Sequence, residues 1–335
     1  MIILLNIMEI PIKNNLYLAP VKGITDNTFR EIYAASFKGI DAAIAPFIRS
    51  DDSNKKLMKL SPDFNRTLKT IPQILTSSPA EFIELSERLA GLGCDEINWN
   101  LGCPFSMVIK KGEGAAMLSL PDKIDEFLGS VHKKKLPGIS VKMRLGFHAP
   151  DEILSVIPVL NSYPLKNIII HARTADMMYR GRVNINAFKE ALNISRHPVI
   201  YNGDITHYDD IKFLSSVFSG VSGWMIGRGL LTNPFLVEEI NFNRELPSDI
   251  KLARLKKFLE ELLDAYMSVL QSPAHVLDHM HGIWSYISLH FENGKKIEKR
   301  IKKTAGINHY RDEFNRIFDS EPGFRTHESL LHSLI

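Results

Sequence analysis

Short apolar runs alternate with amphipathic stretches along the first two thirds of the chain. Eight of these runs have the length of a strand, and the run at 167–171 holds three consecutive isoleucines, typical of a strand buried on both faces. The predicted strands are 16–19, 42–45, 72–75, 96–99, 139–143, 167–171, 199–202 and 223–226. Helical spacing is found between most of them, at 25–35, 80–92, 121–134, 151–160, 185–193 and 208–216.

Strand–helix alternation repeated eight times predicts an α/β fold, a TIM (β/α)₈ barrel over residues 12–240. A doubly wound sheet is the alternative, because periodicity does not prove that the sheet closes. Thr25 or Asp26 is the expected cap of the first helix, and the charged stretch 51–66 is expected to be irregular.

Beyond Pro234 only helical spacing remains. The predicted helices are 250–270, 274–291, 295–304 and 310–318. We therefore expect a smaller all-helical C-terminal domain at residues 246–335, joined through the polar stretch 241–248. Trp284, Tyr286 and Leu289 share one predicted helix, and we expect them to be core residues.

Composition and charge leave the class of partner open. The chain has 335 residues, of which 44% are hydrophobic and 24% are charged. Its net charge of +3 is too small by itself to indicate a nucleic-acid partner. Its two cysteines, Cys94 and Cys103, suggest neither a disulfide framework nor a metal site, so we expect a reducing, cytoplasmic location and no metal. Residues 1–12 are too short to span a membrane and make a poor signal peptide. We expect a monomer.

One stretch organises the chemistry, Asp-Glu-Ile-Asn-Trp-Asn-Leu-Gly-Cys-Pro at 95–104, followed by a glycine-bearing run at 110–118. Gly102 and Pro104 end the strand and place Cys103 at its carboxyl end, where we expect an accessible thiol. The competing interpretation is a small apolar residue in a loop. The other strand ends favour the functional interpretation, because they are also polar.

In a TIM barrel the active site lies at the carboxyl ends of the strands. Seven of the eight predicted ends carry polar or glycine-rich residues, which a purely structural barrel does not need. They are Pro20, Val21, Lys22 and Gly23, then Gln73, Asn100 with Cys103, Lys142 with Arg144, His171 with Arg173, Asn202 with Asp204, and Gly227 to Gly229. Each is a weak signal alone, since Lys142 could be an ion-pair partner and His171 a core histidine, but together they indicate a site.

The last two strand ends predict a phosphate site. Asn-Gly-Asp at 202–204 and Gly-Arg-Gly at 227–229 offer close backbone approach, free amides and a guanidinium. An amide at Gln73, an ammonium at Lys142 and an apolar floor at 18–21 would suit flavin mononucleotide, FMN. Composition and spacing reach a phosphate-bearing cofactor and do not by themselves identify a flavin.

The ordered motifs closely resemble those of the tRNA-dihydrouridine synthases. They are Leu-Ala-Pro-x-x-Gly-x-Thr-Asp at 18–26, Pro-Gln at 72–73, Asn-x-Gly-Cys-Pro at 100–104, Val-Lys-x-Arg at 141–144, His-x-Arg-Thr at 171–174, Asn-Gly-Asp at 202–204 and Met-Ile-Gly-Arg-Gly at 225–229. The tail, with Gly-Ile-Trp-Ser-Tyr at 282–286, also looks like that family's RNA-binding domain. The resemblance implies an FMN enzyme that uses NADPH to reduce the C5–C6 double bond of particular uridines in tRNA.

The resemblance also implies a role for each matching residue. Cys103 would be the proton donor, Asn100 would orient the uracil, and Arg144 and Arg173 would lie near the flipped nucleotide or the cofactor. The residues implied to hold FMN are Pro20, Val21, Lys22, Gln73, Lys142, His171, Asn202, Gly203, Asp204, Gly227 and Arg228. Three positions depart from the family pattern, Val21 for Met, Asn98 for Asp, and Ala172 for Gly or Pro. These departures bear on the subfamily, since none removes a charged or reactive group.

Hydride addition at C6 of uracil must be followed by protonation at C5, and a thiol with an ordinary pKa near 8.5 can supply that proton at neutral pH. The target must leave the base stack, so we expect it in a tRNA loop. Two other classes remain open at this point. One is an FMN barrel oxidoreductase acting on a free small metabolite, and the other is a non-catalytic RNA-binding protein that has kept the fold.

A basic segment at 295–303 is the predicted RNA contact of the tail. It holds six basic residues and one acidic residue, and Ile297 and Ile301 are spaced so that one face can pack while the cations project. The residues are Lys295, Lys296, Lys299, Arg300, Lys302 and Lys303. A solvated helix face is the competing interpretation.

Overall fold

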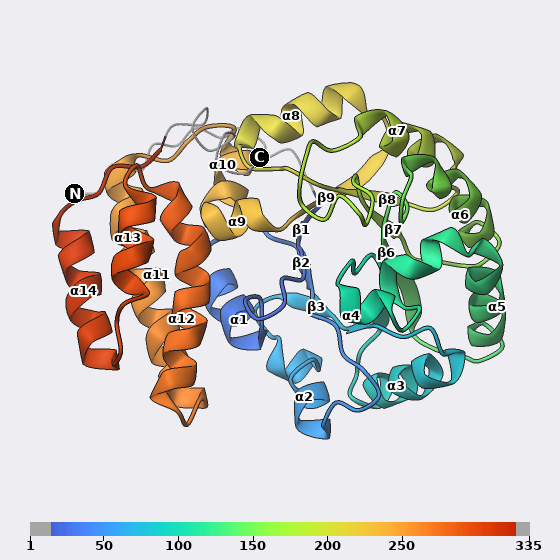
Figure 1. Ribbon diagram of the computed structural model, residues 1–335, viewed down its shortest axis with the longest axis horizontal. Helices are drawn as coiled ribbons and strands as arrows, with labels where there is room; N and C mark the ends of the chain where they lie inside the picture. Colours follow the sequence, from blue (N-terminus) through green and yellow to red (C-terminus); the bar gives the residue numbers. More distant parts are fainter. Residues whose placement is uncertain (1–14, 326–335) are drawn as a thin grey trace.

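The computed structural model describes residues 15–325, so the predictions for 1–12 and for 326–335 fall outside the described residues. All the strands are parallel and form one sheet in the order β3-β2-β1-β9-β8-β7-β6-β5-β4. Their bounds are β1 Leu16–Leu18, β2 Ala42–Ile44, β3 Lys69–Ile71, β4 Gln73–Ile74, β5 Glu96–Leu101, β6 Gly138–Arg144, β7 Ile168–His171, β8 Val199–Asn202 and β9 Val221–Ile226. Helices surround this sheet, and the predicted TIM barrel is confirmed (Figure 1).

The predicted strand at 72–75 is wrong in its bounds, because the chain forms two short strands on either side of Pro72. Proline has no backbone N–H to donate to a ladder. β3 pairs with β2 and β4 pairs with β5, while the Pro72 carbonyl accepts the Asn98 amide at 2.8 Å. The two ends of the sheet are therefore consecutive pieces of chain, and the barrel closes through them.

Isoleucine in β7 packs on both faces of the sheet, as the sequence predicted. Ile169 belongs to a small apolar cluster with Ile44 and Ile200 inside the barrel. Ile168 and Ile170 belong to the large cluster between the sheet and its helices. Alternate side chains of a strand point to opposite faces, so both faces of β7 are buried and an uninterrupted apolar run is required.

The predicted barrel helices are confirmed within a few residues, and Asp26 caps the first by accepting the Phe29 amide at 2.9 Å. The barrel helices are α1 Asn27–Ser36, α3 Pro79–Gly91, α5 Pro121–Val131, α6 Ile153–Leu160, α7 Ile185–Ile194 and α8 Tyr208–Val217. Shorter ones are α2 Asn54–Met58, α4 Ser106–Ile109, α9 Arg228–Thr232 and α10 Leu236–Phe242, with 3₁₀ turns at Pro62–Phe64, Gly114–Ser119 and Pro150–Glu152. The stretch 51–66 is thus not irregular throughout, because Ser53 caps α2.

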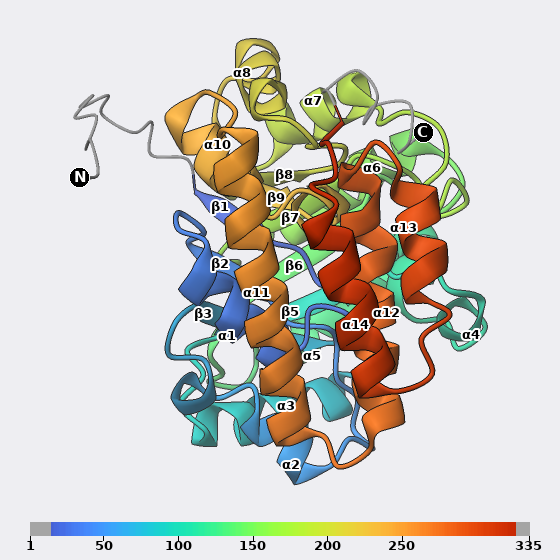
Figure 2. The same cartoon turned by 90° about the vertical axis from the view of Figure 1, so that its left-hand side faces the viewer.

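The C-terminal region is helical, and α11 packs on α1 of the barrel. The ring of Phe258 lies 5.0 Å from that of Phe37 and 6.3 Å from that of Tyr33, measured between centroids, and the Tyr266 hydroxyl donates to Asp26 at 3.0 Å. The elements are α11 Ser248–Val269, α12 Pro273–Ile287, a 3₁₀ turn at Ser288–His290, α13 Gly294–Ile301 and α14 Ile307–Asp319. Figures 1 and 2 show them grouped on one side of the barrel.

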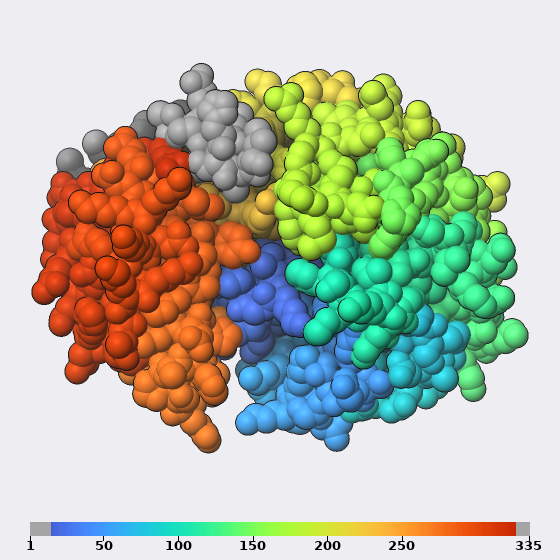
Figure 3. Space-filling view, in the orientation of Figure 1, coloured from blue at the N-terminus to red at the C-terminus, as the bar shows by residue number. Residues whose placement is uncertain are grey.

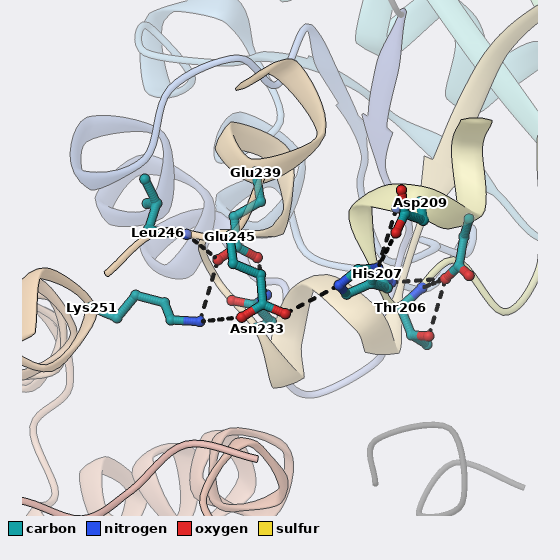
Figure 4. Close-up of polar contacts among 9 residues, drawn as sticks. Thr206, His207, Asp209, Asn233, Glu239, Glu245, Leu246 and Lys251 are labelled. Atoms are coloured by element: carbon teal, nitrogen blue, oxygen red, sulfur yellow. Dashed lines mark hydrogen bonds and ion pairs between the residues drawn. The ribbon is translucent and has the colours of Figure 1, made fainter. Parts of the chain in front are cut away.

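A buried polar network joins the barrel to the start of α11 (Figure 4). Lys251 is almost fully buried, and its ammonium lies 3.4 Å from a carboxylate oxygen of the equally buried Glu239. The same carboxylate accepts the Asn233 amide at 2.6 Å, while Glu245 pairs with His207 at 3.2 Å. Separating a buried ion pair leaves an uncompensated charge, which is strongly destabilising. The Lys251–Glu239 pair therefore stabilises the observed position of α11 on the barrel. Among the described residues no helix combines the length and the apolar character needed to cross a bilayer.

Candidate functional site

A cleft with a cavity volume of about 270 Å³ opens at the carboxyl ends of the strands. In the space-filling view a hollow lies between the orange C-terminal helices and the teal segments, with blue N-terminal residues at its floor (Figure 3). The predicted residues that line the cleft are Pro20, Val21, Lys22, Gln73, Asn100, Cys103, Lys142, Arg144, His171, Asn202, Gly203, Asp204, Gly227 and Arg228. The structure therefore brings together every predicted catalytic, substrate-binding and cofactor-binding position except one.

The exception is Arg173, which is buried and does not line the cleft. Its guanidinium donates to the backbone carbonyls of Arg180 and Gly181 and to both carboxylate oxygens of Asp204. Arginine lacks an acceptor and offers five N–H donors, and four of these point to protein oxygens here. The geometry thus places Arg173 behind Asp204 as its positioning partner.

Glycine is needed where the chain approaches itself closely beside Asp204. Gly203 has a φ of +141°, and a Cβ there would lie 2.7 Å from the Val183 side chain. A Cβ on Gly229, in the first turn of α9, would lie 2.0 Å from the Ile205 carbonyl oxygen. Both contacts are too short for any side chain. The backbones after β8 and β9 therefore meet at one wall of the cleft, where Arg228 projects.

Lys142 on β6 is a partly buried cation of the site. Its ammonium donates to the Asn202 side-chain oxygen at 3.1 Å, and the Asn202 amide donates to the Met225 carbonyl at 2.8 Å. Burial, followed by the charge of Arg144, lowers the pKa of Lys142 to about 7. Near neutral pH this amine can therefore gain or lose a proton in response to a bound group.

His171 at the end of β7 holds a buried ring nitrogen, Nδ1, without a hydrogen-bond partner among the described residues. Burial lowers the pKa of His171 well below its ordinary value, and the neighbouring Arg144 and Lys142 charges act in the same direction. The imidazole is therefore neutral. Buried polar atoms are nearly always paired in folded proteins, so Nδ1 needs a partner that enters the cleft.

A continuous line of side-chain amides runs from the barrel interior to the cysteine loop. Asn98 donates to Ser140 at 3.0 Å, Gln73 donates to Asn98 at 2.7 Å, and Asn100 donates to Gln73 at 2.7 Å. The Asn100 oxygen then accepts the backbone amides of Gly102 at 3.0 Å and Cys103 at 2.9 Å. Asn98, noted in the sequence as a departure from the family pattern, is thus the inner anchor of a chain that sets the position of Cys103.

Cys103 lines the cleft but is only 7% exposed. The thiol is therefore less accessible than the sequence predicted. Leu75, Val108 and Phe47 pack around it. Burial raises the pKa of the Cys103 thiol, against the opposing effects of the Phe105 amide and of the Lys22, Arg144 and Arg49 charges. The group is consequently a protonated thiol at neutral pH.

The loop that follows Cys103 is fastened at a second point. Glu113 is buried and accepts both guanidinium arms of Arg49, at 2.6 Å and 3.1 Å. Next to it, Gly114 has a φ of +59°, and a Cβ there would lie 2.8 Å from the Cys103 carbonyl oxygen. This bidentate pair and the close backbone contact hold the 110–118 run, singled out in the sequence, against the cysteine.

Aromatic residues on the cleft wall were missed in the sequence. Tyr179, in the segment after β7, lies beneath two guanidinium groups, with Arg228 4.9 Å and Arg144 5.3 Å from its ring centroid. Phe47 and Tyr286 also line the cleft. Tyr179 and Phe47 stand in loops without periodicity, so no local signal places them there.

Tyr286 corrects the expectation of a common core for the 282–289 segment. Trp284 is fully buried and donates to the Tyr310 hydroxyl at 2.8 Å, as expected of a core residue. Tyr286 and Leu289 are only partly buried, and Tyr286 reaches the cleft from α12. The docking of α12 over the barrel mouth is a long-range arrangement that helical spacing does not encode.

The basic segment of α13 is arranged as predicted in its packing. Ile297 and Ile301 are buried. Lys295, Lys296, Lys299, Lys302 and Lys303 are exposed, whereas Arg300 is partly buried against Glu313. Lys302 pairs with Glu298 at 2.6 Å, so the strongest free charge of the segment lies at its other lysines.

Comparison with known proteins agrees with these motifs. A sequence model of the dihydrouridine synthase family matches residues 17–326. The chain is 30% identical to "tRNA-dihydrouridine synthase B" of Pasteurella multocida, over 67% of this chain and 68% of the relative. It is 31% identical to "tRNA-dihydrouridine(16) synthase" of Pseudomonas putida, over 68% and 73%, respectively. It is 28% identical to "Probable tRNA-dihydrouridine synthase" of Aquifex aeolicus, over 87% and 96%.

Proposed function

The chain belongs to the dihydrouridine synthase family, and from this premise we propose that it reduces the C5–C6 double bond of specific uridines in tRNA to 5,6-dihydrouridine. The observation that carries the proposal is a protonated thiol, Cys103, in one cleft with Lys142, His171 and Arg228. The relatives' names, all of which refer to tRNA-dihydrouridine synthases, support the same substrate.

FMN is the proposed cofactor, with NADPH as reductant, and the described residues fit it. The unpartnered Nδ1 of His171 is a buried polar atom that a ligand in the cleft would satisfy. Lys142 would face the flavin ring. Because burial lowers the pKa of its amine to about 7, the amine can take up a proton when an anion binds beside it. Pro20, Val21, Lys22, Gln73 and Asn202 complete the proposed cofactor wall.

The phosphate of FMN would bind at Arg228 and the backbone at Gly227. Asp204 stands 3.4 Å from the Arg228 guanidinium, but its charge is already matched by the bidentate pair with Arg173. One acid and two arginines leave a net charge of one positive unit at this wall, which favours an anion. Arg228 also stacks over Tyr179, so the guanidinium is held in place before the phosphate arrives.

A bound reduced flavin would supply hydride to C6 of uracil. Negative charge then develops at C5 and O4, and C5 needs a proton from an acid in the cleft. The Cys103 Sγ carries that proton, because burial keeps the thiol in its neutral form. The Asn98–Gln73–Asn100 amide chain holds the Cys103 backbone in place, and the remaining donor of the Asn100 amide would orient the uracil.

The helical region, residues 246–335, is the proposed RNA-binding part, with the α13 lysines as its contacts. A flipped uridine reaches the cleft only if the rest of the tRNA is bound outside it. Arg144, which donates to the Gly102, Thr174 and Met178 carbonyls, would stiffen the wall beside the nucleotide.

The test is to purify the full chain and record its visible spectrum, then to incubate it with NADPH and either unmodified tRNA or free uracil. A flavin spectrum with dihydrouridine formed only in tRNA is the expected result. Reduction of free uracil at a comparable rate would favour the metabolite-reducing class. A colourless, inactive protein that binds tRNA would favour the non-catalytic class.

A further inference from the structure

Two large apolar side chains are exposed on the segment that follows Cys103. Phe105 is 46% exposed and Met107 is 77% exposed, which makes Met107 the most exposed large hydrophobic side chain among the described residues. Contiguous exposed apolar surface marks interaction sites and binding grooves, whereas single scattered apolar residues are normal on a protein surface.

The segment holds these side chains outward in a fixed arrangement. Val108 is buried between Phe47 and Cys103, and it anchors the inner side of α4. The Val108 amide donates to the Phe105 carbonyl at 2.8 Å, and the Lys110 amide donates to that of Ser106 at 2.9 Å. The outward position of Met107 is therefore set by local folding. Binding of a partner would need little further ordering of this segment, so the entropy cost of binding is small.

The surroundings of the pair suit a polyanion. Lys110 and Lys111 are exposed one turn beyond Met107, and no acidic residue occurs between Phe105 and Lys111. Lys22 is exposed on the cleft rim, and Phe105 itself lines the cleft. Figures 1 and 2 place α4 on the same face of the molecule as α13.

We propose that Phe105 and Met107 contact the RNA bases next to the uridine that enters the cleft. The inference rests on the proposed function and states how the site contacts the tRNA loop on either side of the reacting uridine. A uridine that leaves the stack exposes the faces of its neighbours, and apolar or aromatic side chains can replace the lost stacking. The lysines favour RNA over an apolar protein partner, because clustered positive charge binds phosphates.

The experiment compares Met107→Gln, Met107→Leu and Phe105→Ala with wild type in the flavin-loaded full chain, using unmodified tRNA and NADPH. Met107→Gln and Phe105→Ala should each raise the KM for tRNA about fivefold or more, and Met107→Leu should stay near wild type because its bulk remains apolar. The salt dependence of tRNA binding should not change, since no charge is altered. Oxidation of NADPH without RNA by Met107→Gln should equal that of wild type.

Matched controls are Met58→Gln on α2 and Phe213→Ala on α8, which are 47% and 58% exposed and do not line the cleft. Both should leave the KM unchanged. An unchanged KM in Met107→Gln and Phe105→Ala would overturn the inference, as would an equal loss in Met107→Leu. If wild type itself forms no dihydrouridine in tRNA, the proposed function fails, which is a separate result from failure of the variants.

Discussion

Asp204 receives Arg173 through both of its carboxylate oxygens, with Oδ1 2.9 Å from Nη1 and Oδ2 2.5 Å from Nη2. The Arg173 guanidinium is buried, so it neutralises the acid from behind and leaves the cleft side to Arg228. A bidentate pair in a partly desolvated site has a fixed orientation as well as a charge. This relationship would let a carboxylate stand at the proposed phosphate site without repelling the phosphate.

The first prediction follows from that charge balance. Arg228→Ala should weaken FMN retention by roughly 10- to 100-fold, because a hydrogen bond to a charged group contributes about 1.5–3 kcal/mol. Flavin content per protein chain after dialysis, read from the visible spectrum, is the measurement. Arg311→Ala on α14, where the native side chain pairs with Asp264 at the surface, is the matched control and should keep its flavin. Full flavin in Arg228→Ala would refute the phosphate assignment.

The second prediction separates the two half-reactions. Cys103→Ala should leave the reduction of bound flavin by NADPH nearly intact, because the thiol has no part in that step. Dihydrouridine formation should fall by about 100-fold or more, the usual size of a lost general acid. Stopped-flow bleaching of the flavin absorbance and dihydrouridine analysis of the tRNA measure the two halves.

Cys94 is the control for this prediction. Its sulfur packs near the Leu60 carbonyl at 3.7 Å, and burial raises the pKa of its thiol to about 11. Cys94→Ala should therefore lower stability slightly and keep both half-reactions. Equal losses of uridine reduction in the two variants would remove Cys103 from the role of acid.

Much of this site could be predicted from sequence because a parallel barrel ties function to strand ends. Once Ile168–His171 and Val199–Asn202 are recognised as strands, His171 and Asn202 must share one rim. The strand positions follow from apolar runs that are short and local. Even the error at Pro72 displaced no site residue, since Gln73 stays inside the barrel.

The remaining features depend on contacts between distant segments. Tyr286 reaches the cleft because aromatic packing of Phe258 on α1 docks the helical region over the barrel, and no local pattern encodes that docking. Arg144 is the last residue of β6 and Arg173 follows the adjacent β7, yet Arg173 is turned behind Asp204 and Arg144 faces the cleft. Their directions depend on which carbonyls the loops offer, and these become known only in three dimensions.

The third prediction concerns pH. Folding lowers the pKa of Lys142 from 10.5 to about 7, so between these values the unfolded flavin-free chain binds more protons than the folded one. The free energy of unfolding should therefore rise with pH above about 7, by at most about 1.4 kcal/mol per pH unit from this group. Below pH 7 the cost of burying the charged amine is fully present.

Lys142→Met tests this sign. The variant should be more stable than wild type near neutral pH, and its advantage should shrink as the pH rises toward about 9. Urea unfolding of the flavin-free proteins at several pH values gives the difference, which cancels the titration of groups common to both. Lys133→Met, at an exposed position, should show no such trend. A stability difference that stays constant with pH would contradict the lowered pKa of the partly buried Lys142 amine.

The fourth prediction places tRNA on α13. Replacing Lys295, Lys296 and Lys299 by Gln should weaken tRNA binding and flatten its salt dependence, while flavin content stays unchanged. These lysines are exposed, and Lys302 is left in place because Glu298 already pairs with it. Each phosphate contact contributes about 0.7–0.9 to the slope of log K against log salt. The slope should therefore fall by about two units if all three lysines reach phosphates.

The matched control removes the same charge from the opposite end of the barrel. Lys133, Lys134 and Lys135 are exposed in the connection between α5 and β6, at the amino ends of the strands. Their replacement by Gln lowers the net charge equally. A general electrostatic effect would therefore flatten the salt dependence in both triple variants, whereas loss of a binding surface would flatten it only in the α13 variant. Filter binding at several salt concentrations gives both slopes. An unaltered slope for the α13 variant would move the RNA contact to the cleft rim, near Arg49, Lys110 and Lys111.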